Sequence, residues 1–185
     1  MTPSQTIGPF FHFITRNADL GCLARPGAKG SRIRVRIRLL DGDATPVPDA
    51  MLEIWQADAS GKYDHPEDPQ ALTPDPEFCG FGRLATDQDG SCLFETIYPG
   101  SVSDGRGVVQ APHLNLSVFA RGLLERLCTR MYFEGDEALG SDPVLALVPE
   151  DRRQTLIAHA DPHQPGEWNF DIHLQGEEET VFFDL

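Results

Sequence analysis

The sequence predicts an all-β protein, an antiparallel β-sandwich with long irregular loops and little helix. Short segments in which apolar and polar residues alternate recur along the chain, and this period of two is that of a half-buried strand. Turn-forming residues separate these segments at short intervals, a pattern typical of antiparallel sandwiches rather than of βαβ units. Helix is scarce, and one segment is the best candidate for it.

The clearest predicted strand covers residues 31–40. Ile33, Val35, Ile37 and Leu39 alternate there with four arginines. Neighbouring side chains of a strand point to opposite faces of its sheet. We therefore expect one face of this strand to lie in the core and the other to be cationic.

Seven further segments are rich in β-forming residues. Asp87-Gln-Asp-Gly90 separates two of them and predicts a hairpin, because Asp and Gly tolerate the positive φ that tight turns require. The predicted strands are residues 51–57, 82–86, 91–97, 113–119, 127–133, 168–174 and 180–183.

One segment favours helix and another favours loop. Residues 149–160 begin with Pro149, Glu150 and Asp151, which suit the first turn of a helix. Residues 58–79 carry four prolines and show no periodicity, so we expect a long irregular loop. Loops of this kind on a rigid sheet often carry function.

Composition excludes two kinds of partner. The formal net charge of −14 opposes nucleic acid, and Lys and Arg form no stripe along the sequence. Apolar runs are far shorter than the roughly 20 residues of a membrane helix, and no basic segment followed by an apolar one opens the chain. We expect a soluble, cytoplasmic protein with a single domain over residues 1–185 and an N-terminal arm over about 1–30.

Few residues stand out as candidates for chemistry. His113 and Asn115 lie two apart on a predicted strand, so both side chains point to the same side of the sheet. They either face one ligand or form a hydrogen-bonded polar pair beneath a loop. Tyr63 is open to two readings as well, a functional hydroxyl or a packing residue of the loop. The sequence has no dinucleotide-binding or phosphate-binding glycine motif and no nucleophile elbow.

An ordered set of segments resembles the intradiol ring-cleaving dioxygenases and spans essentially the whole chain. Each segment alone is modest evidence, but the order of the set is specific. The segments are Thr2-Pro-Ser-Gln-Thr-Ile-Gly-Pro-Phe10, Leu52-Glu-Ile-Trp-Gln-Ala-Asp58, Gly61-Lys-Tyr63, Phe81-Gly-Arg83, Thr86-Asp87, Pro99-Gly100, Ala111-Pro-His-Leu-Asn-Leu-Ser117, Arg130-Met-Tyr-Phe-Glu-Gly-Asp136 and Phe170-Asp-Ile-His-Leu-Gln-Gly176.

The resemblance also shows where this chain departs from the family's catalytic pattern. Catalytic members hold ferric iron with two tyrosines and two histidines, since tyrosinate oxygens stabilise the 3+ state. The matching positions here are Tyr63, Val102, His113 and Asn115, and Gln110 occupies the position of the family's catalytic arginine. Half of the ligand set is therefore missing, and we expect no catalytic residue and no iron in this chain.

By resemblance, such a chain is the non-catalytic alpha chain of a two-chain enzyme. A homologous beta chain would bind Fe(III), and several alpha–beta pairs would form a larger hetero-oligomer. The enzyme would open a catechol acid between its two hydroxyls with both atoms of O₂. This chain would line the substrate cavity with Thr6, Gly8, Pro9, Phe10 and Arg130. For the arginine, an ordinary surface ion pair is the alternative.

Two other functions remain open at this point. The chain is either a self-sufficient intradiol dioxygenase that replaces the missing ligands, for example with His65, or a non-enzymatic binding module on the same fold. The metal content of the isolated chain distinguishes a self-sufficient dioxygenase from a subunit. Coexpression with an iron-bearing homologue distinguishes a binding module from a subunit.

Overall fold

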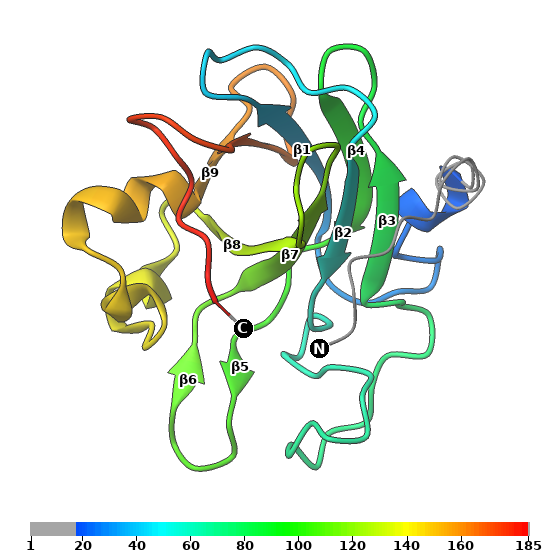
Figure 1. Cartoon of the computed structure of the whole chain (residues 1–185). Helices are drawn as coiled ribbons and strands as arrows, with labels where there is room; N and C mark the ends of the chain where they lie inside the picture. Colours follow the sequence, from blue (N-terminus) through cyan, green and yellow to red (C-terminus); the bar gives the residue numbers. More distant parts are fainter. Residues whose placement is uncertain (1–17, 185) are drawn as a thin grey trace.

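The computed structural model describes residues 18–184, whose strands form one nearly closed, barrel-like sheet of eight strands in the order β3-β2-β7-β8-β9-β10-β1-β4 (Figure 1). A separate two-stranded hairpin, β5–β6, extends from one end. The bounds are β1 Arg32–Leu40, β2 Met51–Trp55, β3 Phe81–Ala85, β4 Ser91–Ile97, β5 Val102–Ser103, β6 Val109–Gln110, β7 His113–Phe119, β8 Leu127–Phe133, β9 Ile157–Ala160 and β10 Glu167–His173.

The prediction of a mostly β protein is confirmed, but the antiparallel sandwich is wrong, since the main sheet is a single, nearly closed sheet of mixed direction. β1 pairs in parallel with β10, and β8 pairs in parallel with β9. Both parallel pairs join strands that are distant in the sequence, so short-range turn signals carry no information about their direction. The sheet also curls until its edge strands β3 and β4, which a hairpin connects, lie close together.

The strand periodicity places the core correctly. Ile33, Val35, Ile37 and Leu39 of β1 are all buried inside the sheet, as predicted. The predicted turn at residues 87–90 closes the hairpin between β3 and β4, with Gly90 at φ 68°. A second, smaller core lies outside the barrel and contains Ala111, Tyr132, Leu145, Val148 and Leu156.

Two predicted elements are wrong in part. Residues 149–160 form a 3-10 helix, η5 (Glu150–Leu156), followed directly by β9, because the chain must return to the sheet beside β8. Residues 180–183 form only an isolated bridge between Phe183 and Cys128. The other 3-10 helices are η2 Ala18–Gly21, η3 Glu137–Ser141 and η4 Leu145–Leu147.

The long loop over residues 58–79 is irregular, as predicted, and lies at the same end of the barrel as the β5–β6 hairpin (Figure 1). Among residues 18–184, no helix has the length and apolar character needed to cross a bilayer. The single domain over 1–185 and the arm over about 1–30 stay predictions.

Candidate functional site

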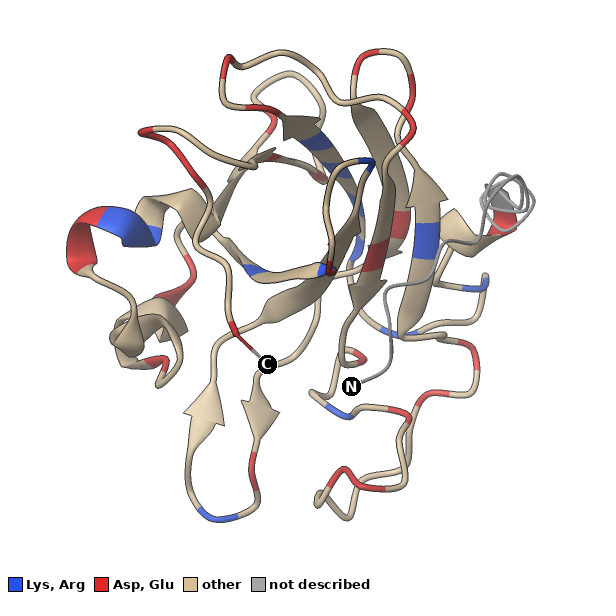
Figure 2. Cartoon of the chain, in the orientation of Figure 1, with Lys and Arg blue, Asp and Glu red and all other residues tan. Residues whose placement is uncertain are grey.

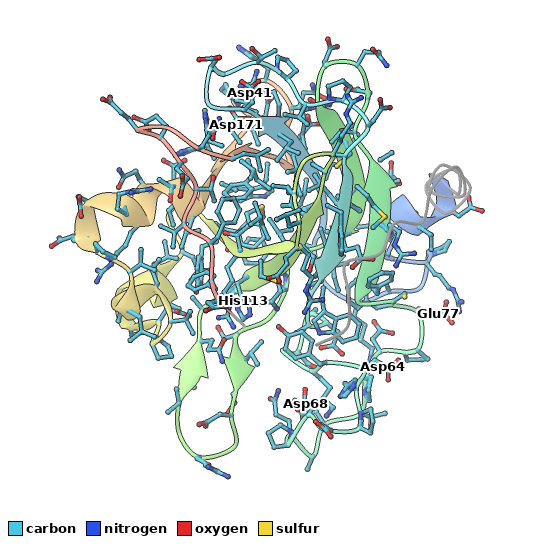
Figure 3. The ribbon with its side chains drawn as sticks, in the orientation of Figure 1. Asp41, Asp64, Asp68, Glu77, His113 and Asp171 are labelled. Carbon is cyan, nitrogen blue, oxygen red and sulfur yellow. The ribbon has the colours of Figure 1, made fainter. Side chains whose placement is uncertain are left out.

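The candidate site lies where the loop meets the end of β7 and the β5–β6 hairpin, and Figure 3 shows His113 there beside the loop that carries Asp64 and Asp68. Two glycines let the backbones approach closely. A Cβ on Gly61 would lie 2.0 Å from the carbonyl oxygen of Ser101, and one on Gly100 would lie 2.5 Å from the Gly61 nitrogen. Both segments therefore require glycine for this contact.

Tyr63 is fixed by contacts on both its ring and its backbone. Its ring stacks on Trp55 with centroids 5.8 Å apart and planes 9° apart. Its amide donates to Asp68 Oδ2 at 2.8 Å, and Asp68 in turn pairs with the buried Lys62 ammonium at 3.1 Å. The loop thus presents the phenol from a rigid position.

His113 is a buried, neutral imidazole of defined tautomer. Its Nδ1 lies 2.7 Å from the Ala111 carbonyl oxygen, which can only accept, so Nδ1 carries the proton and Nε2 is an acceptor. Burial, together with the nearby charge of Arg130, lowers the pKa of His113 to about 4. The ring is therefore uncharged at neutral pH.

Asn115 completes a chain of hydrogen bonds with a single direction. Its Nδ2 donates to the Trp55 carbonyl oxygen at 3.3 Å, which fixes the amide orientation, and also to Tyr63 Oη at 3.0 Å. The Tyr63 hydroxyl is 3.2 Å from His113 Nε2, which needs a donor. The proton order runs from Asn115 through Tyr63 to His113 and then to Ala111.

The phenol in this chain is protonated. Burial raises the pKa of Tyr63, against the hydrogen bond from Asn115 and the charge of Arg130, which lower it. A tyrosinate would also lose the hydrogen bond that the hydroxyl donates to His113. The cluster of Tyr63, His113 and Asn115, called here the neutral cluster, is therefore satisfied without a metal ion.

Gln110, Val102 and Arg130 lie beside the neutral cluster. Val102 is buried and pairs with Gln110 across the hairpin. Arg130 of β8 is the register partner of Asn115 on β7, and its Nη1 donates to Gln110 Oε1 at 2.7 Å. The alternative of an ordinary surface ion pair is wrong for the described part of the chain, since no carboxylate of residues 18–184 lies within 4.0 Å of Arg130.

The donors at the four matching positions do not fit ferric iron. Valine offers no lone pair, and Asn115 turns its amide nitrogen, a donor, toward the phenol. One protonated phenol and one imidazole remain, and these bond to each other. His65 is exposed and its Nδ1 accepts from the Glu67 amide. Within residues 18–184, no group of three or more His, Cys, Asp or Glu side chains is arranged to hold a metal ion.

The structure brings Tyr63, His113, Asn115, Gln110 and Arg130 together. The predicted cavity residues of the N-terminal segment, Thr6, Gly8, Pro9 and Phe10, lie outside the described residues.

Sequence reasoning missed two residues of the neighbourhood, Tyr132 and Asp142. Tyr132 Oη donates to Asp142 Oδ1 at 3.0 Å, and the Arg130 side chain donates to Tyr132. The spacing of two between Arg130 and Tyr132 on a predicted strand was the signal that could have found the tyrosine. Nothing local in the sequence links Asp142 to this group.

Comparisons with known proteins find dioxygenase relatives along nearly the whole chain. A family model for dioxygenases matches residues 8–176. The chain is 41% identical over 198 residues to the protocatechuate 3,4-dioxygenase alpha chain of Pseudomonas putida, covering 100% of this chain and 96% of that one. It is 36% identical over 184 residues to the protocatechuate 3,4-dioxygenase beta chain of Burkholderia cepacia, covering 96% and 77%.

A solved structure extends the likeness to three dimensions. The dioxygenase domain of a dioxygenase carbohydrate-binding protein fusion from Streptomyces sp. SirexAA-E superposes with a TM-score of 0.64 at 26% identity. The match covers 95% of this chain and 98% of that chain. The nearly closed sheet is thus the fold of that dioxygenase domain.

Proposed function

This chain belongs to the intradiol dioxygenase family, and on that premise we propose that it is a non-catalytic, alpha-type subunit of a protocatechuate 3,4-dioxygenase. With a homologous beta chain it would form the enzyme that cleaves protocatechuate between its hydroxyls with O₂, giving 3-carboxy-cis,cis-muconate. The family uses non-haem Fe(III). In this proposal the beta chain binds the iron.

The neutral cluster is the observation that carries the proposal. By resemblance its three side chains stand at ligand positions of the family, and they satisfy one another through neutral hydrogen bonds. Binding Fe(III) there would require the loss of the Tyr63 proton and would still leave two ligand positions empty. The family fold is thus retained in a chain whose own donor set is unsuited to the metal.

In this proposal the subunit contributes surfaces that line the substrate cavity and pair with the beta chain. Thr6, Gly8, Pro9 and Phe10 would line the substrate cavity that opens at the junction with the beta chain. Arg130 would lie near the cavity mouth and meet the carboxylate of the substrate. The similarity of this chain to both an alpha and a beta chain supports pairing between two related folds, and several such pairs would form the complete oligomer.

Metal analysis and reconstitution test the proposal together. The chain is purified alone and after coexpression with a homologue that carries the Tyr/Tyr/His/His set. We expect the isolated chain to be colourless and free of stoichiometric iron, and the coexpressed pair to be coloured and to consume O₂ with protocatechuate. Stoichiometric iron in the isolated chain would establish the self-sufficient dioxygenase instead. Failure of any such homologue to copurify would favour a binding module.

A gain of iron in a double variant sharpens the test. Val102→Tyr with Asn115→His restores the two missing donors beside Tyr63 and His113. We expect this variant alone to bind Fe(III) and to show a visible tyrosinate-to-iron absorption band. Val102→Phe with Asn115→Gln is the matched control, because it adds comparable bulk without suitable donors.

A further inference from the structure

We infer that Gln110 and Tyr132 are positioning residues that hold the Arg130 guanidinium as an un-neutralised cation for the carboxylate of an aromatic catechol acid. This inference rests on the proposed function and adds to it a physical reason for selectivity. It assigns a use to Gln110, the residue that stands at the family's arginine position.

The guanidinium is held by two oxygen acceptors that carry no charge. One is the amide oxygen of Gln110, 2.7 Å from Nη1. The other is the phenol oxygen of Tyr132, which is fully buried and accepts from the arginine while donating to Asp142. Both acceptors fix the direction of the planar fork of Arg130, and neither cancels its positive charge.

The carboxylate of Asp142, which is close to this arrangement, is occupied elsewhere. Asp142 accepts from the backbone nitrogens of Ala111, Val144 and Leu145 as well as from the Tyr132 hydroxyl. It therefore lies one hydrogen bond beyond the arginine and anchors Tyr132. No carboxylate of residues 18–184 forms an ion pair with the guanidinium.

Three groups near Arg130, on the neighbouring strand and the loop, are also uncharged. Asn115 is its partner across the sheet, and the imidazole of His113 and the phenol of Tyr63 are both neutral. The positive charge of Arg130 also disfavours protonation of His113. A partly buried arginine among neutral groups retains donors for a planar anion, and a carboxylate matches its fork in charge and geometry.

The substitution Gln110→Glu tests this inference because it keeps an oxygen acceptor and supplies the missing negative charge. It is made in the coexpressed pair, with protocatechuate and unsubstituted catechol as substrates. We expect the KM for protocatechuate to rise about tenfold, with kcat for both substrates and the KM for catechol changed less than about twofold. A purely structural role would change both substrates alike.

Three further variants complete the experiment. Arg130→Gln removes the cation and sets the maximum expected rise in KM for protocatechuate. Arg126→Gln removes an exposed positive charge four residues earlier and is the control that leaves the ratio of KM values unchanged. If Gln110→Glu does not assemble, Tyr132→Phe removes the second acceptor, and we expect a rise of about threefold in the same ratio.

The outcomes separate this inference from the proposed function. An active wild-type pair whose KM ratio is unaffected by Gln110→Glu and Tyr132→Phe overturns the inference and leaves the subunit proposal standing. A wild-type pair without ring-cleaving activity overturns the proposed function, and the inference fails with it.

Discussion

The arginines of β1 and the arginine of β8 stand on the same sheet but meet different partners. Figure 2 shows the cationic bands of β1. There, Arg34 and Arg36 both pair with the buried Glu167 carboxylate, and Arg38 pairs with Asp171. Arg130 of β8 instead bonds to the amide oxygen of Gln110. Arg34, Arg36 and Arg38 of β1 thus lie against carboxylates, whereas Arg130 of β8 lies against an uncharged oxygen.

This difference distinguishes arginines that hold two strands together from an arginine that is available to bind an anion. The ion pairs of β1 join it to β10, its parallel neighbour, and so help to fix a pairing between strands that are far apart in the sequence. An arginine whose charge is already matched has little to gain from an external anion. On β8, the neutral surroundings leave the charge of Arg130 available.

Acidification is expected to have the largest effect, by breaking the neutral cluster. The pKa of His113 is lowered from 6.5 to about 4 in the folded chain. Between these values the unfolded chain binds a proton that the folded chain does not. The contribution of neutral His113 to the free energy of unfolding is complete above pH 6.5. It falls by about 3 kcal/mol as the pH is lowered toward 4.

Urea unfolding of the wild type and of His113→Gln at pH 7, 5.5 and 4.5 measures this contribution. The variant is expected to be less stable at pH 7 and to lose less stability on acidification, since carboxylates titrate in both proteins. Equal losses of stability on acidification in the two proteins would contradict the conclusion that folding lowers the pKa of His113.

Removal of the buried carboxylate from the β1 face is expected to have the next largest effect. Glu167→Gln leaves Arg34 and Arg36 without their shared partner, and the side chain of Glu167 is only 1% exposed. We expect a loss of about 2 kcal/mol in the free energy of unfolding. The KM ratio for protocatechuate and catechol in the coexpressed pair is the control, and it stays at its wild-type value because these arginines have no role in recognition.

Loss of one hydrogen-bonding group of the neutral cluster is expected to lower the free energy of unfolding less than loss of the Glu167 carboxylate. Tyr63→Phe removes the donor to His113 Nε2 and the acceptor for Asn115 while keeping the stacking on Trp55. We expect a loss of about 1 kcal/mol, measured by chemical denaturation at pH 7. The iron content of the coexpressed pair is expected to stay unchanged, and a proportional loss of iron would show that Tyr63 binds metal.

The smallest effect is expected at the exposed ion pair of β1. Asp171→Asn removes the partner of Arg38, and both side chains are more than 40% exposed. We expect the stability to stay within about 0.5 kcal/mol of the wild type, and any difference to vanish at high salt. A loss as large as that of Glu167→Gln would contradict the view that burial decides the strength of these pairs.

The fold was predictable where one strand's pattern suffices. Alternation predicted β1, and the bounds 113–119 and 127–133 of β7 and β8 agree with the structure. The helix expected over 149–160 was wrong in part because a helical start signal says nothing about the strand that the chain must add beside β8. The predicted polar pair His113 and Asn115 lies beneath a loop and is hydrogen-bonded, although through Tyr63 rather than directly.

The sequence by itself determined the side-chain chemistry. A valine and an amide stand where the family resemblance predicts two ligands, and period-two patterns indicate the buried face of each strand. Only the tertiary structure decided the partners, namely the parallel neighbours of β1 and β8 and the neutral oxygens around Arg130. The physical reason is the distance along the chain over which each interaction acts. Strand propensity and side-chain direction are set by neighbouring residues, whereas an arginine's charge is cancelled or retained by groups that folding brings from distant segments.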